Sequence, residues 1–306
     1  MSKEVVRGHF ALGGANVMWG LMSPIAKAVM LGGLITPLIV TQFRIFGAMI
    51  LFWVYSMFKP KEKVAKKDLL KLFGASLLAI VFNQGSFVFG VGLSSPVNAS
   101  IIATSMPLWA LLLSALYLKE SITGMKVLGI GMGATGALML VLGGGAGMAQ
   151  NENHIWGDLL VLFAQLSYAS YIVLYKNFVS KYSTVTIMKW MFTFASICML
   201  PFAFFSFPSV EWSMVSIQDY SGLFFVVFCG TFLSYIFVTM GQKVLRPTVT
   251  GMYNYVQPVV ASIAAICWGL DSFSFLKLLS VALIFFGVYF VNAGNSLSIK
   301  KIFSRR

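Results

Sequence analysis

The amino-acid sequence predicts an all-α membrane protein, with ten transmembrane helices arranged as two five-helix halves of opposite orientation. Hydrophobic residues make up 58% of the 306 residues, charged residues only 10%, and the mean hydropathy is +0.86. Soluble domains carry roughly 25% charged residues. A bilayer can accommodate this much apolar surface, whereas the core of a soluble domain of the same length cannot.

Apolar runs follow one another along the whole chain, and each is close to the roughly 20 residues that a spanning helix needs. The runs are too long, and too poor in two-residue alternation, for barrel strands. The first run follows a short charged stretch, but its length predicts an uncleaved helix instead of a secretory signal. The expected helices cover residues 8–30, 36–58, 69–93, 96–118, 125–143, 156–177, 184–206, 221–241, 247–269 and 275–294.

Basic residues are concentrated in alternate segments between the runs. If the N-terminus is cytoplasmic, 18 of the 22 lysines and arginines lie in cytoplasmic segments, and the outer loops carry acids such as Glu152 and Glu211. Cytoplasmic loops of membrane proteins are enriched in Lys and Arg. The pattern therefore predicts a multi-pass protein of the cytoplasmic (inner) membrane with both termini inside. It also accounts for the net charge of +13 without nucleic-acid binding.

The chain resembles itself when it is shifted by 151 residues. In this register Gly90 matches Gly241, Pro107 matches Pro258 and Gly136 matches Gly287, with no gap. Each half would contain five helices, an odd number, so the second half must enter the membrane from the opposite side. We expect one repeat in residues 1–145 and another in 146–306, which ends in a short basic cytoplasmic tail. Such inverted repeats are typical of secondary transporters.

Three segments carry a family resemblance. They are WGLMSPIAK (19–27), SSPVNASIIATSMPLWALLLSALYLKES (94–121) and NYVQPVVASIAAICWGLDS (254–272). They resemble the drug/metabolite transporter superfamily, specifically its EamA-type ten-helix branch. The resemblance implies export or exchange of small metabolites, often amino acids, and leaves the substrate open. The second half departs from the pattern, because only Ser167–Tyr168 stands where the first half has Trp19–Gly20.

Prolines within the apolar runs point to the position of a cavity. Pro107 and Pro258 lie about eleven residues inside matching helices, and Pro24 lies inside the first. A proline inside a helix removes a backbone hydrogen bond and bends the chain. Paired irregular helices are the usual sequence sign of a midplane binding site. A packing kink without ligand contact is the alternative.

Polar side chains gather on the same helices. Because amides are costly in hydrocarbon, we expect them to face the bundle interior. For any one of them an interhelical hydrogen bond is an equally good explanation; for the group as a whole we favour cavity lining. With the buried cation Arg44, the predicted cavity comprises Asn16, Trp19, Ser23, Arg44, Asn83, Gln84, Asn98, Ser105, Tyr168, Tyr171, Tyr253, Asn254 and Gln257.

Charged residues inside the runs are rare. Arg44 and Lys189 are approximate counterparts, and either could hold a substrate carboxylate, snorkel to the interface or fix a gate. No acid lies deep in a run; Asp158 comes nearest. A carboxylate or histidine within the membrane is the usual proton relay. The sequence therefore favours facilitated export or exchange over carboxylate-gated proton coupling.

Glycines at 129, 133, 136 and 287 predict close helix packing, within the bundle or at a dimer seam. The three cysteines are isolated and are expected to be packing residues. We expect no cofactor and no metal site. The expected partners are a small-molecule solute and the lipid bilayer, and the chain should be a monomer or a weak dimer.

Together these features predict a carrier for a small organic solute that works by alternating access. Aromatic residues in the polar helices suit an amino acid or a related compound. An integral-membrane enzyme acting on a lipid-linked substrate would need a cluster of acids, histidines or metal ligands, and the sequence has none. A channel would need a continuous polar stripe or a charged ring.

Overall fold

The computed structural model describes residues 3–93, 102–103, 105–143, 154–267 and 275–303. Asn98 lies outside these ranges, and the side chains of Ser23 and Pro24 are outside the description too. Across the described residues the chain is helical, without a strand. The longer helices and the two π-helical turns are α1 (Lys3–Leu31), α2 (Pro37–Met57), α3 (Lys66–Ser76), η1 (Leu77–Phe82), α4 (Asn83–Leu93), α6 (Met106–Tyr117), α7 (Gly124–Gly143), α8 (His154–Leu174), α10 (Thr184–Ser206), α11 (Ile217–Val227), η3 (Phe228–Leu233), α12 (Ser234–Val244), α14 (Val256–Cys267) and α15 (Phe275–Phe303).

Five helical stretches in the described ranges are long and apolar enough to cross a membrane. Two of them run through a π turn, so that α3, η1 and α4 form one rod and α11, η3 and α12 form another. The all-helical membrane architecture is thereby confirmed, while the count of ten spans stays a prediction. The five stretches are Pro37–Met57, Lys66–Phe87, Ile155–Leu174, Thr184–Ser206 and Ile217–Val244.

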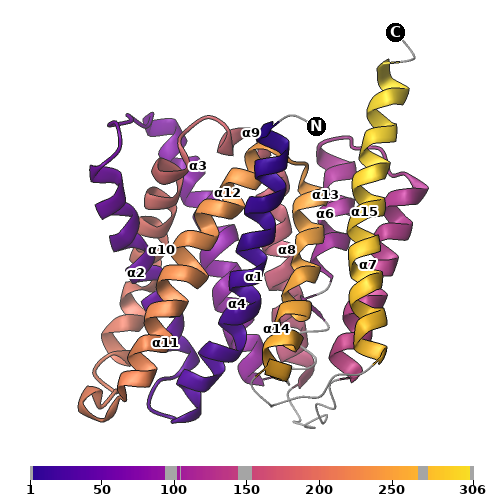
Figure 1. The fold of residues 1–306 in the computed structure, drawn as a ribbon. Helices are drawn as coiled ribbons and strands as arrows, with labels where there is room; N and C mark the ends of the chain where they lie inside the picture. The colour runs from indigo at the N-terminus through magenta and orange to yellow at the C-terminus, as the bar shows by residue number, and fades with distance from the viewer. Residues whose placement is uncertain (1–2, 94–101, 104, 144–153, 268–274, 304–306) are drawn as a thin grey trace.

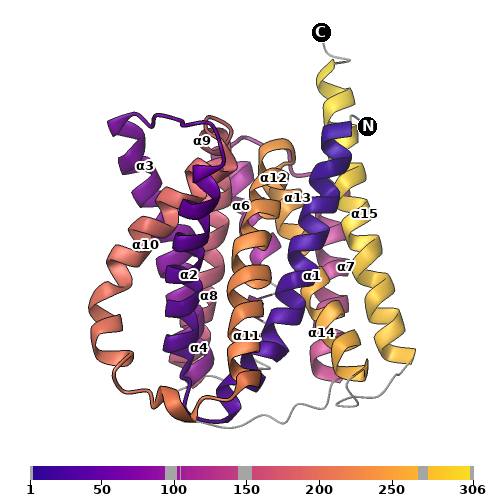
Figure 2. The ribbon, with the colours of Figure 1, turned by 60° about the vertical axis from the view of Figure 1, so that its left-hand side comes forward.

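The helices form one upright bundle, with the start of α1 and the end of α15 at the same end (Figure 1). In both side views α2 and α10 form one flank and α7 and α15 the other (Figures 1 and 2). Between the flanks, α1 packs on α12 and α14, and α8 packs on α4 and α6. Under the 151-residue register these pairings correspond to one another. The arrangement brings α1, α4, α8 and α12 to the centre.

Glycines allow α7 and α15 to touch along their backbones. A Cβ on Gly129 would lie 2.6 Å from the carbonyl oxygen of Gly287, and one on Gly136 would lie 2.6 Å from that of Ser280. Only hydrogen fits at such distances. The predicted close packing of these glycines is confirmed, and it lies within the bundle.

The two predicted proline kinks are helix interruptions. Pro107 occupies the first turn of α6, where its missing N–H requires no partner. Pro258 follows a 3₁₀ turn, η4 (Tyr253–Tyr255), which separates α14 from the short helix α13 (Pro247–Met252). A turn at Ser105 thus precedes the helix that contains Pro107, and a 3₁₀ turn precedes the helix that contains Pro258.

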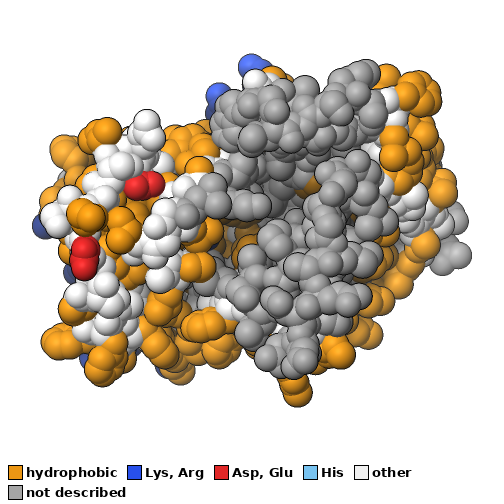
Figure 3. Space-filling model, turned by 90° about the horizontal axis from the view of Figure 1, so that it is seen from below, with side chains coloured by type: hydrophobic (Ala, Val, Ile, Leu, Met, Phe, Trp, Pro, Cys, Tyr) orange, Lys and Arg blue, Asp and Glu red, His pale blue; other side chains and the backbone are white. Residues whose placement is uncertain are grey.

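Charges differ between the two ends. At the end opposite the termini, the connection between α10 and α11 carries Glu211, and the first turn of α11 carries Asp219, which forms a capping box with Ser216. Figure 3 views this end, where acidic side chains stand out among apolar and polar atoms on the described part of the face. The basic segment between α2 and α3 lies at the end that holds the termini (Figure 1).

Candidate substrate site

Tyr235 on α12 lies at the centre of the bundle and connects several predicted site residues. Its hydroxyl accepts a hydrogen bond from Nε2 of Gln84 at 2.9 Å, and its side chain is buried. Its ring meets Trp19 edge-on at 5.9 Å between centroids and Phe192 at 5.1 Å. Aromatic rings prefer such edge-to-face contacts. Gln84 and Tyr235 are also 151 residues apart, so each is the repeat counterpart of the other.

Arg44 reaches the same region from α2. Its Nε donates to Oγ1 of Thr231 at 3.1 Å, and Thr231 lies four residues before Tyr235. No ion pair within the described ranges involves Arg44. This half-buried guanidinium uses one N–H on the Thr231 hydroxyl, so it has further donors for an anionic or carbonyl group of a solute.

A row of three tyrosines, two on α8 and one directly after it, extends from the centre toward the end that holds the termini. Tyr168, Tyr171 and Tyr175 lie about one helical turn apart, with ring centroids 6.0 and 6.1 Å from each other. Tyr168 also faces Trp19, at 6.3 Å. The Tyr171 hydroxyl donates to Oε1 of Gln242 at 3.3 Å. The three rings therefore lie along one face of this segment.

Several buried polar atoms have no hydrogen-bond partner among the residues that the structure describes. They are Oε1 of Gln84, the hydroxyl of Tyr168, Oγ of Ser105 and Nε1 of Trp109. Buried polar atoms are satisfied in most proteins, so an unpaired group points to a water, an ion or a ligand. The Gln84 oxygen and the Tyr168 hydroxyl thus offer an acceptor and a donor next to the contact between Trp19 and Tyr235.

The remaining predicted amides form a second group, along the seam between α1 and the α13–α14 segment. Gln257 donates to Oδ1 of Asn16 at 2.9 Å and to Oδ1 of Asn254 at 3.4 Å, and Tyr253 bonds Nδ1 of His9 at 2.7 Å. These groups satisfy one another. Trp19 packs against the core clusters on both sides and so lies between the two groups.

Two other predicted residues have structural partners. The Asn83 amide donates to the carbonyl of Ala164 at 2.9 Å and ties α4 to α8. Lys189, the approximate counterpart of Arg44, places Nζ over the ring of Trp53 at 4.8 Å, in the arrangement of a cation–π contact.

Tyr235 and Thr231 are functional candidates that the sequence analysis did not single out. Each is an ordinary residue of an apolar run. For Tyr235 a signal exists, because the 151-residue register places it on Gln84. The register aligns Thr231 with Ile80, an apolar residue, so it gives no sign that Thr231 belongs to a site.

Polar contacts tie the bundle together at the end that holds the termini. The Asp68 carboxylate accepts from Nζ of Lys181 at 2.5 Å and from the Tyr182 hydroxyl at 2.6 Å. Glu120 pairs with the buried Lys126 at 3.1 Å and accepts from Thr248 at 3.2 Å. These contacts join the segments before and after residue 145.

Lys176 adds a cation to the same end. It lies in the short helix α9 (Lys176–Val179), beyond the span Ile155–Leu174, and donates to the carbonyls of Gln242 and Leu245. Burial lowers the pKa of Lys176 to about 8, and the charge of Glu120 opposes that shift.

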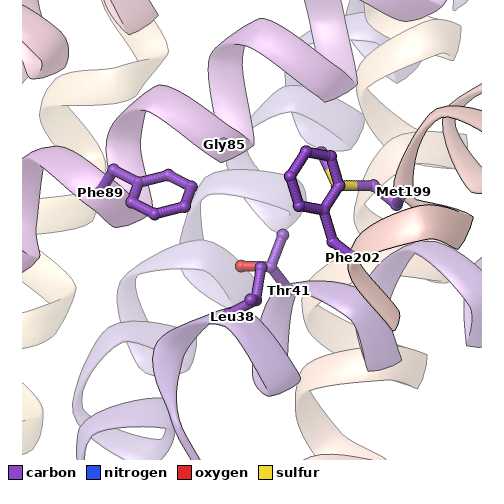
Figure 4. Close-up of a pocket in the computed structure, with 6 residues that line it drawn as sticks. All are labelled: Leu38, Thr41, Gly85, Phe89, Met199 and Phe202. Carbon is purple, nitrogen blue, oxygen red and sulfur yellow. The ribbon is translucent and has the colours of Figure 1, made fainter. Parts of the chain in front are cut away.

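A separate cavity of about 50 Å³ lies between α2, α4 and α10 (Figure 4). Leu38, Thr41, Gly85, Phe89, Met199 and Phe202 line it, and the only polar side chain, Thr41, donates to the carbonyl of Pro37. It offers no group to recognise a polar solute, so the chemistry favours the Tyr235 region. Within the described ranges no group of three or more His, Cys, Asp or Glu side chains converges as a metal site would.

Comparison with known proteins places the chain in a family. The EamA-like transporter family model matches residues 6–142 and again 155–293. The chain belongs to the EamA-like transporter family. The predicted resemblance is thereby confirmed, and an EamA-like chain is a membrane transporter.

Relatives within this family have diverged widely. The uncharacterized transporter YetK of Bacillus subtilis is 22% identical over 81% of this chain and 75% of its own length. An S-adenosylmethionine uptake transporter of Rickettsia felis is 24% identical over 61% of this chain and 60% of its own length. A solved structure described as "Crystal structure of protein" has a TM-score of 0.79, at 15% identity, over 97% of this chain and 99% of that one. At that identity the likeness concerns the fold.

Proposed function

We propose that this EamA-like chain carries a small organic metabolite across the cytoplasmic membrane by alternating access, with the solute bound beside Tyr235. The Gln84–Tyr235 hydrogen bond carries the proposal, because it joins two repeat counterparts at the centre of the bundle. A contact between counterparts lies on the axis that relates the two halves. Solute sites of inverted-repeat transporters lie at that interface.

The proposed architecture has ten spans, a repeat in residues 1–145, an inverted repeat in 146–306, and both termini in the cytoplasm. The reciprocal packing of α1 on α12 and α14 and of α8 on α4 and α6 supports it. The double match of the family model supports it too.

The proposed solute is an amino acid or a related compound, moved outward or in exchange. Arg44 and the unpaired atoms of Gln84 and Tyr168 suit a molecule with both a negative group and a hydrogen-bond donor. Trp19, Tyr168 and Tyr235 suit an apolar or cationic portion. S-adenosylmethionine has all of these features and is the solute named for a relative, so it belongs in the first screen.

A thermal-shift screen of purified protein against amino acids and S-adenosylmethionine tests the site. Arg44→Ala and Gln84→Ala should remove the shift that a bound solute produces. Asn83→Ala should lower the unfolding temperature but keep the ligand shift, because Asn83 bonds to Ala164. A ligand shift that survives both Arg44→Ala and Gln84→Ala would place the solute elsewhere.

A further inference from the structure

Two π-helical turns occupy equivalent places in the chain. η1 covers Leu77–Phe82 and η3 covers Phe228–Leu233, so their first and last residues are each 151 apart. π turns are rare, widen the helix and are common at functional sites. Their recurrence in register means that both long rods carry the same irregularity, one on each side of the Gln84–Tyr235 pair.

Each π turn accepts a hydrogen bond from a side chain on a central helix, and that helix belongs to the other half of the chain. Nε1 of Trp19 on α1 donates to the carbonyl of Gly230 in η3 at 3.0 Å. Oγ of Ser167 on α8 donates to the carbonyl of Leu78 in η1 at 2.8 Å. Ser167 lies 148 residues after Trp19, and Leu78 and Gly230 are 152 residues apart, so both pairs lie one to three residues off the 151-residue register. The two interhalf hydrogen bonds are therefore approximate counterparts, with a serine hydroxyl in place of the indole N–H.

The same turns touch the candidate site. Thr231 in η3 accepts the hydrogen bond from Arg44, and Gly230 precedes it. The Tyr235 hydroxyl lies 3.5 Å from the carbonyl of Ala79 in η1. Movement of either turn therefore changes the surroundings of the solute.

We propose that Trp19 and Ser167 are positioning residues that set the balance between the outward- and inward-facing states. This inference rests on the proposed function. A two-fold rotation that exchanges the halves also exchanges the two states and exchanges Trp19 with Ser167. If loss of one hydrogen bond favours one state, loss of the other must favour the opposite state. Bonds that serve stability alone would be equally strong in both states and would shift neither.

The test measures the two states directly, without solute. Spin labels at Lys67 and Ser180, both exposed, flank the Asp68–Lys181 contact and report opening of that end. Double electron–electron resonance in lipid nanodiscs gives the ratio of short to long distances, after Cys198, Cys229 and Cys267 are replaced by alanine. Trp19→Phe removes Nε1–H but keeps a ring, and Ser167→Ala removes the hydroxyl.

The two variants should shift this ratio in opposite directions, by about two- to tenfold, the factor that one net hydrogen bond supplies. The double variant should return toward the parent ratio, and Ser167→Thr should retain it. Ser170→Ala is the matched control, because Ser170 bonds within its own helix, to the carbonyl of Leu166 at 2.8 Å. It should leave the ratio unchanged.

If Trp19→Phe and Ser167→Ala shift the ratio in the same direction, or if both leave it unchanged, the proposal is overturned. A single distance in every protein would overturn it too. If Trp19→Phe does not fold, Ser167→Ala against Ser167→Thr and Ser170→Ala decides the matter. A shift in Ser167→Ala alone supports the proposal, and its absence overturns it. The readout needs no solute, so its failure leaves the thermal-shift test of the proposed function standing.

Discussion

The contact between α7 and α15 allows a quantitative prediction for Gly287→Ala. The new Cβ would lie 2.5 Å from the carbonyl oxygen of Gly129, 2.8 Å from the backbone nitrogen of Gly133 and 3.1 Å from its Cα. All three are backbone atoms, so no side-chain rotation relieves the clash. The helices must separate until the closest contact is ordinary.

Overpacking of this kind costs about 1–3 kcal/mol. At about 2–4 °C per kcal/mol for a chain of this size, the unfolding temperature should fall by about 2–12 °C. Thermal unfolding in a mild detergent, followed by tryptophan fluorescence, measures it. The matched control is Gly131→Ala on the same α7, where a Cβ meets no atom within 4 Å. An equal fall in both variants would refute the argument, because helix propensity alone favours alanine at both places.

Three further predictions concern the site and the end that holds the termini. Tyr235→Phe removes the acceptor of the Gln84 amide and leaves a buried donor unpaired, at about 1–3 kcal/mol. Solute affinity measured by the thermal-shift titration should therefore fall by about five- to 150-fold, whereas Tyr289→Phe, on an exposed ring of α15, should leave it unchanged. Lys181→Ala should leave the midpoint of chemical denaturation nearly unchanged, because the Lys181 side chain is largely exposed and such ion pairs are weak; a clear fall of the midpoint contradicts this. Burial holds the pKa of Lys176 at about 8, so between pH 8 and 10.5 the unfolded chain binds more protons than the folded chain and the free energy of unfolding should rise with pH. Lys176→Met should flatten the resulting rise in unfolding temperature. A slope equal to that of the parent protein would mean that another group causes the rise.

The fold could be predicted from the sequence because a bilayer allows only a few kinds of backbone structure. Apolar runs in hydrocarbon must be helices, and the glycines of α7 and α15 have no other use at such spacing. The exact form of the helices was not accessible. A π turn has no residue signature, and η1 reads as the apolar stretch Leu77–Phe82. The helix breaks before Pro107 and Pro258 depend on packing that the proline pattern alone does not reveal.

The candidate site was predicted in part. Trp19, Arg44, Gln84 and Tyr168 meet around one centre, as polar residues on inward faces should. The sequence could not separate them from Asn16 and Gln257, which bond to each other, or from Asn83, which bonds to a backbone carbonyl. An amide looks the same in a sequence whether its partner is a solute or a neighbouring helix. Tyr235 needed the repeat register to be noticed.

Counterflow in proteoliposomes tests the central claim of a carrier with a site beside Tyr235 most directly. Vesicles are preloaded with the unlabelled solute from the thermal-shift screen, and uptake of the same labelled compound is followed. The account predicts that preloading accelerates uptake to a transient overshoot, that Tyr235→Phe abolishes it, and that Tyr289→Phe retains it. Uptake that is indifferent to preloading, as through an open pore, or an overshoot that survives Tyr235→Phe, would contradict it.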